Sequence, residues 1–106
     1  MAGDYQNPGP LREEIDAWQG PLLLEFGTSW CGHCQAAASV IAQALTEFQS
    51  VEHVKVEDGP GRQLGRSFRV KLWPTVIFLN DGVELGRAVR PETAAEIRSG
   101  LEKLRD

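Results

Sequence analysis

Residues 22–26 (LLLEF) most constrain how this chain can fold, because they are apolar on both of the faces that a strand presents. Successive side chains of a strand point to opposite faces, so a strand of this kind has to be covered on both sides. The segment stops at Gly27, and from Gly32 to Gln49 apolar residues recur at helical spacing. We therefore predict a central strand that leads directly into a long helix.

The rest of the chain alternates between strand and helix patterns. Strands are expected at 51–56, 75–79 and 83–89, with short helices after Pro10 and at 63–68 and a last helix that starts at Pro91. Asn80-Asp81-Gly82, between the last two strands, is a hairpin signal. This order predicts an α/β fold in which a mixed central sheet is flanked by helices on both faces and ends in a β-hairpin and a helix.

The length of 106 residues fits one domain over residues 1–106, with residues 1–9 as a loose lead-in. A net charge of −4 argues against nucleic-acid binding, which needs clustered Lys and Arg. No apolar run approaches the roughly 20 residues that cross a bilayer, and the N-terminus has no basic, apolar leader. We expect a cytoplasmic monomer with neither nucleic-acid nor membrane partners.

Cys31 and Cys34 enclose two residues at the point where the central strand gives way to the long helix. The N–H groups and dipole of a helix N-terminus favour negative charge, so a thiol there ionises more easily, and the thiolate is the attacking species. We therefore expect Cys31 to be the exposed attacker and Cys34 the resolver that closes an intramolecular disulfide. A structural staple is disfavoured, because so short a loop gains little chain entropy.

Two other interpretations of the cysteine pair are open. A C-x-x-C sequence can be half of a zinc site, but the chain has no second cysteine pair, and His33 and His53 do not give a usual zinc-ligand spacing. The cysteines could also be buried and inert, although Gly-His between them at a helix start argues against this. We expect neither a metal nor a cofactor.

Two motifs resemble those of the thioredoxin family. Residues 26–34 (FGTSWCGHC) resemble its active-site run, and Trp73-Pro74-Thr75 resembles its cis-proline signature. The resemblance implies a thioredoxin-like fold and a protein-disulfide reductase that exchanges its dithiol with protein disulfides as a reductant. It also implies a flavin-dependent thioredoxin reductase as electron donor. The alternative is a non-enzymatic adaptor or redox sensor of the same fold that binds a partner protein.

The second motif implies where substrate binds. By resemblance, Pro74 would be cis and would face the two sulfurs. The backbone beside it would then pair with an extended substrate segment, a form of strand addition. Trp30, Trp73 and Thr75 would complete this substrate-binding rim.

Glu25 is the one charged residue of its strand. Burying an acid costs free energy unless the acid is paired, so we expect Glu25 to have a specific role. By resemblance, Glu25 would take the proton of Cys34 during the resolving step, and Lys55 falls where the family places a lysine paired with that acid. The other interpretation is a solvated acid at a strand end.

Gly32 and His33, between the cysteines, are expected to tune the redox potential. His33 replaces the proline usual in thioredoxins and matches the Cys-Gly-His-Cys run of protein disulfide isomerase domains. A cationic histidine would stabilise the Cys31 thiolate, and stabilising the reduced form makes the pair more oxidising. The other interpretation is a surface histidine with little effect.

The chain also departs from the family pattern. Gly27 stands where thioredoxins usually have Trp, and Ser39 where they have a helix-kinking Pro. Trp73 precedes the proline in place of a small or aliphatic residue, and residues 1–10 lack an apolar run for the first family strand. These departures should alter the rim of the site and the sheet edge.

Overall fold

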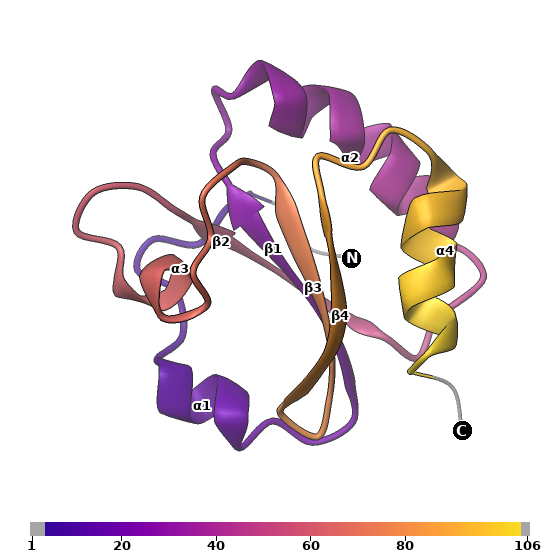
Figure 1. Ribbon diagram of the computed structural model, residues 1–106, viewed down its shortest axis with the longest axis horizontal. Coiled ribbons are helices and arrows are strands. Elements are labelled where there is room, and N and C mark those ends of the chain that lie inside the picture. Colours follow the sequence, from indigo (N-terminus) through magenta and orange to yellow (C-terminus); the bar gives the residue numbers. More distant parts are fainter. Residues whose placement is uncertain (1–3, 105–106) are drawn as a thin grey trace.

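The computed structural model describes residues 4–104 as four strands and four helices, in the order α1-β1-α2-β2-α3-β3-β4-α4 (Figure 1). The strands are β1 (Pro21–Gly27), β2 (Glu52–Glu57), β3 (Thr75–Asn80) and β4 (Val83–Val89). The helices are α1 (Arg12–Asp16), α2 (Gly32–Leu45), α3 (Gln63–Ser67) and α4 (Ala94–Glu102). Within this part of the chain, none of the helices has the length and apolar character needed to cross a membrane.

The four strands form one sheet in the order β2-β1-β3-β4. β1 runs parallel to β2 and antiparallel to β3, and β4 is antiparallel to β3, so the predicted mixed sheet is confirmed. Every residue of β1 after Pro21 is buried, as a central strand requires. The segment that follows β1 therefore starts from a fully buried strand end.

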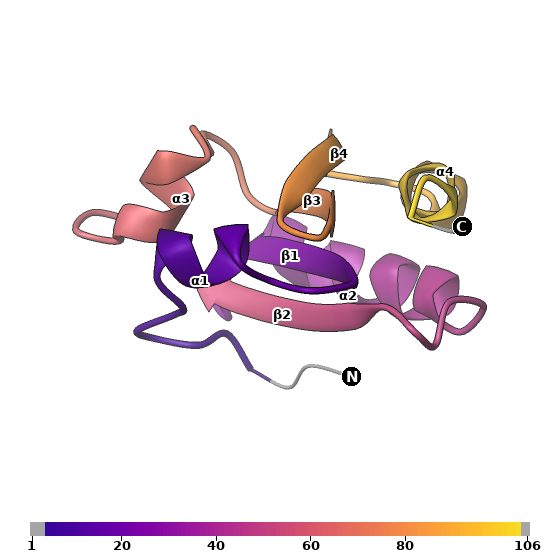
Figure 2. The ribbon, with the colours of Figure 1, turned by 90° about the horizontal axis from the view of Figure 1, so that it is seen from below.

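The side chains of β1 alternate between two cores, one on each face of the sheet. Leu22, Leu24 and Phe26 pack with residues of α1 and α3, whereas Leu23 packs with residues of α2 and α4. Figure 2 shows α1 and α3 grouped apart from α2 and α4. Helices therefore cover both faces, and the parity of the strand places Glu25 on the α2 side, with Leu23.

The predicted hairpin joins β3 to β4 through Asp81 and Gly82, which have φ values of 50° and 78°. Positive φ at both central residues is the requirement of a type I′ turn. Asp81 also fixes the turn to the loop before β1, because its Oδ1 accepts a hydrogen bond from Gly20 N at 2.8 Å. A Cβ atom at Gly82 would overlap the carbonyl oxygen of Asp16, so only glycine fits there.

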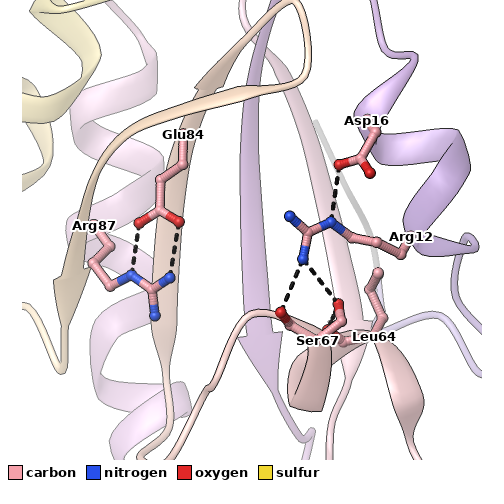
Figure 3. Close-up of polar contacts among 6 residues, drawn as sticks. All are labelled: Arg12, Asp16, Leu64, Ser67, Glu84 and Arg87. Atoms are coloured by element: carbon pink, nitrogen blue, oxygen red, sulfur yellow. Dashed lines mark hydrogen bonds and ion pairs between the residues drawn. The ribbon is translucent and has the colours of Figure 1, made fainter.

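Arg12 connects α1 to α3 on one face of the sheet (Figure 3). Its Nε lies 2.9 Å from Asp16 Oδ1, and its Nη1 donates to Ser67 O at 2.9 Å. The guanidinium also lies over the Phe68 ring, 3.8 Å from the centroid. One side chain thus holds two short helices that have little helical stability of their own.

Arg87 on β4 makes a second set of polar contacts in the same view (Figure 3). Its Nε and Nη2 donate to the two carboxylate oxygens of Glu84 at 2.7 and 2.8 Å. Its Nη1 donates to Phe68 O at 2.9 Å, which attaches the end of α3 to the hairpin.

The last helix begins at Ala94 and not at Pro91, where the sequence placed its start. Thr93 is the N-cap: its hydroxyl accepts from Glu96 N, and the Glu96 carboxylate accepts from Thr93 N at 2.9 Å. This reciprocal capping box satisfies the backbone N–H groups of Glu96 and Thr93. Pro91 cannot form such a box, because its side chain has no hydrogen-bonding group.

The lead-in is docked over residues 5–9, contrary to the expectation that it is loose. Gln6 forms a parallel bridge with Val56, its N donating to Lys55 O at 2.8 Å and its O accepting from Glu57 N at 3.0 Å. A Cβ atom at Gly9 would lie 2.5 Å from Val56 Cγ1, so the backbone lies directly against β2. Residues 1–3 lie outside the described part of the chain.

Gly100 tests how tightly α4 packs on the sheet. A Cβ atom at this buried helical position would overlap the ring of Phe78 on β3. Replacing a helical glycine by alanine ordinarily stabilises by about 0.5–1 kcal/mol, whereas overpacking a core costs about 1–3 kcal/mol. We predict that Gly100→Ala lowers the free energy of unfolding by about 1–2 kcal/mol in urea denaturation. Ser99→Ala, at the exposed neighbouring position, is the matched control and should change stability by less than about 0.5 kcal/mol. A Gly100→Ala protein as stable as the wild type would contradict the packing.

Candidate active site

The two cysteines lie at the start of α2, directly after the buried end of β1. Cys31 is the N-cap residue, with φ −81° and ψ 123°, and Gly32 and His33 are the first, exposed residues of the helix. Cys34 is 3% exposed and shares the buried face of α2 with Ala37, while Cys31 is partly exposed. Both are free thiols in this structure, and one helical turn separates an accessible sulfur from a buried one.

The surroundings of Cys31 favour its thiolate. Burial of the thiol opposes ionisation, but hydrogen bonds from the backbone and thiol of Cys34 and from the backbone of His33, together with the charge of Arg90, outweigh it. The pKa of Cys31 is therefore lowered from its ordinary value. Two of these causes are N–H groups of the first helical turn, the effect predicted from the sequence.

The surroundings of Cys34 favour its neutral thiol. Burial is the largest cause and raises the pKa of Cys34, and the hydrogen bond with Cys31 acts in the same direction. The backbone N–H of Thr28 and the hydroxyl of Tyr5 act in the opposite direction without reversing the shift. Cys34 consequently needs a base before it can attack.

Glu25 lies buried on the α2 face of the sheet, with 2% of its surface exposed, so it is not a solvated strand-end acid. Tyr5 Oη donates to its Oε2 at 2.5 Å, and His53 Nε2 lies 2.8 Å from its Oε1. Each carboxylate oxygen thus has a partner that can donate to it, and an ionised carboxylate only accepts. Hydrogen bonding on both oxygens offsets the cost of burying this acid.

The expected pairing of Glu25 with Lys55 is not found among the described residues, where the basic side chain in contact with the Glu25 carboxylate is that of His53. Lys55 lies opposite Glu25 in the β1–β2 register, but its Nζ lies over the Tyr5 ring, 4.4 Å from the centroid. The docked lead-in explains the difference, because the Tyr5 side chain stands against both Lys55 and Glu25. His53 lies two residues from Lys55, on the same face of β2.

The peptide bond between Trp73 and Pro74 is cis, which confirms the expectation from the motif. Pro74 is buried directly before β3, and its carbonyl accepts from Arg90 N at 2.8 Å. Arg90 Nε donates to Trp73 O, also at 2.8 Å, and Arg90 has a φ of 49°. These contacts hold the Arg90 charge at the site, where it lowers the pKa of Cys31 together with the backbone donors.

Trp30 and Trp73 form an exposed aromatic rim at the site. Their ring centroids are 5.7 Å apart at an interplanar angle of 81°, and Trp30 is 71% exposed. Trp73 Nε1 donates to Asp58 Oδ2 at 2.8 Å, which fixes its ring. Thr75, by contrast, is buried and its hydroxyl donates to Leu72 O at 2.6 Å, so only its backbone is suited to meet a substrate.

Three residues of the site were missed from the sequence: Tyr5, His53 and Arg90. Tyr5 lies in a segment with no periodic pattern, and the positive φ that positions Arg90 leaves no signal in the sequence. His53 had a signal, because strand parity places it on the face of Lys55. Gly27 was a further signal, since a Cβ atom there would lie 2.5 Å from Cys34 Sγ and 2.9 Å from Tyr5 Oη.

Comparisons with known proteins agree with this geometry. The family model for thioredoxin matches residues 6–103. The structure of thioredoxin 2 from Pseudomonas aeruginosa PAO1 in its reduced form is similar, with a TM-score of 0.87 and 53% identity over 98% of this chain and 96% of that chain.

Two curated relatives match over shorter segments. A rice H-type thioredoxin (Oryza sativa subsp. indica) is 29% identical over 68 residues, 64% of this chain and 56% of the relative. Protein disulfide isomerase-like 1-4 from Arabidopsis thaliana is 38% identical over 63 residues, 58% of this chain and 11% of the relative. The chain thus spans little more than half of the first relative and a small part of the second. These matches do not favour a non-enzymatic adaptor. With nearly its whole length covered by the family model and a C-x-x-C pair at the helix start, the chain belongs to the thioredoxin family of thiol–disulfide oxidoreductases.

Proposed function

We propose that this protein reduces disulfide bonds of other proteins, with Cys31 as the attacking thiol and Cys34 as the resolving thiol. The observation that carries the proposal is the opposite behaviour of two neighbouring sulfurs: the pKa of Cys31 is lowered and that of Cys34 is raised. The accessible sulfur is thus ready to attack, while the buried one stays protonated until the mixed disulfide has formed.

The reaction proceeds in two exchanges. The Cys31 thiolate attacks one sulfur of the substrate disulfide, which forms a mixed disulfide and releases the other substrate sulfur as a thiolate. Cys34 then loses its proton and attacks the Cys31 sulfur, which releases the second substrate sulfur and leaves a Cys31–Cys34 disulfide. The substrate gains two electrons from the protein, and its two released thiolates take up protons from solvent. Glu25 is the base of the second exchange, and Lys55, against Tyr5, supplies positive charge next to it.

Substrate binding is assigned to the aromatic rim and the cis-proline. Trp30 and Trp73 offer exposed ring surface beside Cys31, and an extended substrate segment would pair with the backbone around Pro74. The Trp73 carbonyl, which accepts from Arg90 Nε, is an acceptor that a substrate N–H would share. Gly32 and His33 adjust the redox potential from their positions beside Cys31.

The partners follow from the same chemistry. The Cys31–Cys34 disulfide has to be reduced again, and the family resemblance supports a flavin-dependent thioredoxin reductase as the donor. We propose the cytoplasm as the compartment, because thiols stay reduced there. We propose that the protein acts as a monomer.

Insulin reduction driven by dithiothreitol tests the proposed activity. We predict that the protein accelerates insulin precipitation under conditions in which dithiothreitol alone is slow, because Cys31 is the better nucleophile. The Cys31→Ser variant, with Cys34 still present, should show no acceleration. Equal rates with and without the wild-type protein would contradict the proposal.

Alkylation tests which cysteine attacks. A lowered pKa keeps the thiolate populated at lower pH, so Cys31 should react with iodoacetamide with a midpoint below the value of an unperturbed cysteine. Cys34, measured in the Cys31→Ser variant, should react with a midpoint above that value, because burial raises its pKa. Mass spectrometry of substoichiometrically labelled wild type identifies the adduct, and preferential labelling of Cys34 would reverse the assignment.

Substitution of His33 tests the tuning of the redox potential. His33→Pro removes both the imidazole and a backbone N–H that lowers the pKa of Cys31. It should therefore destabilise the thiolate and make the couple more reducing by tens of millivolts, at about 30 mV per 1.4 kcal/mol. His33→Ala, which keeps the N–H, should fall between that variant and the wild type in glutathione-equilibrium titrations. An unchanged or more oxidising His33→Pro couple would refute the role.

A further inference from the structure

We propose that Tyr5 is a catalytic residue of the resolving step, in which its hydroxyl carries the proton from Cys34 Sγ to the carboxylate of Glu25. The inference deepens the proposed function and rests on it for the role of Cys34 as resolver. It assigns chemistry to a residue of the lead-in, a segment in which the sequence shows neither a motif nor a secondary-structure pattern.

The Tyr5 hydroxyl stands between the thiol and the carboxylate. It donates to Glu25 Oε2 at 2.5 Å, and it lies next to the Cys34 thiol, whose pKa it acts to lower against the effect of burial. The bare Cα of Gly27 marks the same place, because a Cβ atom there would lie 2.5 Å from Cys34 Sγ and 2.9 Å from Tyr5 Oη. A sulfur, a hydroxyl and a carboxylate from three segments of the chain therefore meet in one row that runs from the half-buried Tyr5 to two buried groups.

The other oxygen of the carboxylate is already engaged. His53 Nε2 lies 2.8 Å from Glu25 Oε1, and the His53 side chain is only 8% exposed. This contact holds the carboxylate with Oε2 turned to the Tyr5 hydroxyl. The route for a proton from Cys34 to Glu25 consequently runs through Tyr5 Oη.

Tyr5 is held in place by the backbone of the next residue and by a contact with its ring. The next residue, Gln6, is bound to both Lys55 and Glu57 of β2 by backbone hydrogen bonds of 2.8 and 3.0 Å. Lys55 Nζ covers the ring of Tyr5, 4.4 Å from its centroid. A group fixed in this way is preorganised for proton transfer, since no reorientation is required at the moment of reaction.

The step balances with the groups present. In the mixed disulfide, the Cys34 S–H proton passes to Tyr5 Oη while the Tyr5 O–H proton passes to Glu25 Oε2. The Cys34 sulfur then forms its bond to Cys31 Sγ, the bond from Cys31 to the substrate sulfur breaks, and the substrate sulfur leaves with the electron pair. Protonated Glu25 returns its proton, by way of Tyr5, to Cys34 when the disulfide is reduced again.

The two proton transfers take place together. Burial is the largest cause that raises the pKa of Tyr5 far above its usual value, and the carboxylate of Glu25 is the second. A free tyrosinate is therefore not formed on the route. A tyrosine in this position accepts one proton as it donates another, and it does not become charged itself.

Transient kinetics with a chromogenic aryl disulfide separates the two exchanges. Each exchange releases one coloured aryl thiolate: the first phase depends on reagent concentration, and the second is a first-order resolving phase. We predict that Tyr5→Phe, which removes only the hydroxyl, slows the second phase at pH 7 by about tenfold or more, within the range of general acid–base catalysis. The first phase should change by less than about twofold, because Cys31 needs no base.

The pH profile distinguishes catalysis from a structural effect. In Tyr5→Phe, Cys34 has to lose its proton to solvent, so the second-phase rate should rise by about tenfold per pH unit towards that of the wild type. Gln6→Ala, an exposed neighbour bound through its backbone, is the matched control and should leave both phases unchanged. Equal second phases at every pH, or slowing of both phases by one factor, would overturn the proposal.

A double variant tests whether Tyr5 and Glu25 act on one route. Glu25→Gln should slow the same phase, and Tyr5→Phe/Glu25→Gln should be no slower than the slower single variant, because each breaks the same transfer. Effects that multiply in the double variant would overturn the relay.

A measurement on the wild type covers the case in which Tyr5→Phe does not fold. With two protons in motion, the second-phase rate should fall along a curve as the deuterium fraction of the solvent rises; a straight line indicates one proton and overturns the relay. The outcome is separable from that of insulin reduction. A protein that fails with insulin but shows the curved dependence loses the proposed substrate and keeps the relay, whereas one that reduces insulin with a straight line loses the relay alone.

Discussion

The buried carboxylate of Glu25 needs hydrogen-bond partners, and much of the site is arranged so as to supply them. A carboxylate in the middle of a doubly covered sheet is tolerated only when both of its oxygens have partners. β1 cannot supply them, since its other residues are apolar, so one comes from β2 as His53 and the other from the lead-in as Tyr5. The docking of residues 5–9 along β2 is therefore part of the active site, because it delivers the hydroxyl to the acid.

Features that depend on residues close together in the sequence could be predicted from it. Features that depend on contacts between distant residues could not. The buried strand, the cysteines at the helix start, the Asp-Gly hairpin and the cis-proline all rest on neighbours in sequence, and each is found in the structure. Tyr5 meets a partner twenty residues away, from a segment without periodicity. The Lys55 expectation failed for a related reason: strand parity fixes the face of β2, but only the packing of Tyr5 decides whether Lys55 or His53 reaches Glu25.

The two sulfurs have different pKa shifts because Cys34 lies three residues after Cys31 along the helix. Cys31, at the N-cap, is accessible to backbone donors and to the charge of Arg90, whereas Cys34, one turn later, lies against the sheet. The same helix therefore lowers the pKa of one thiol and raises that of the other. In the function that we propose, the raised pKa keeps Cys34 protonated until the resolving step and so couples that step to Glu25. A site with two equally accessible thiols would have no such control over the order of events.

Gly27 connects this chemistry to the departures of the chain from its family. The family usually has Trp at that position, and here even a Cβ atom would reach both Cys34 Sγ and Tyr5 Oη. The missing side chain leaves the place that the Tyr5 hydroxyl occupies, and the segment that carries Tyr5 is bound to β2 by the bridge between Gln6 and Val56. Gly27 and Tyr5 thus belong to one arrangement: the end of β1 carries no side chain, and an aromatic ring enters from the edge of β2 with its hydroxyl next to the buried thiol.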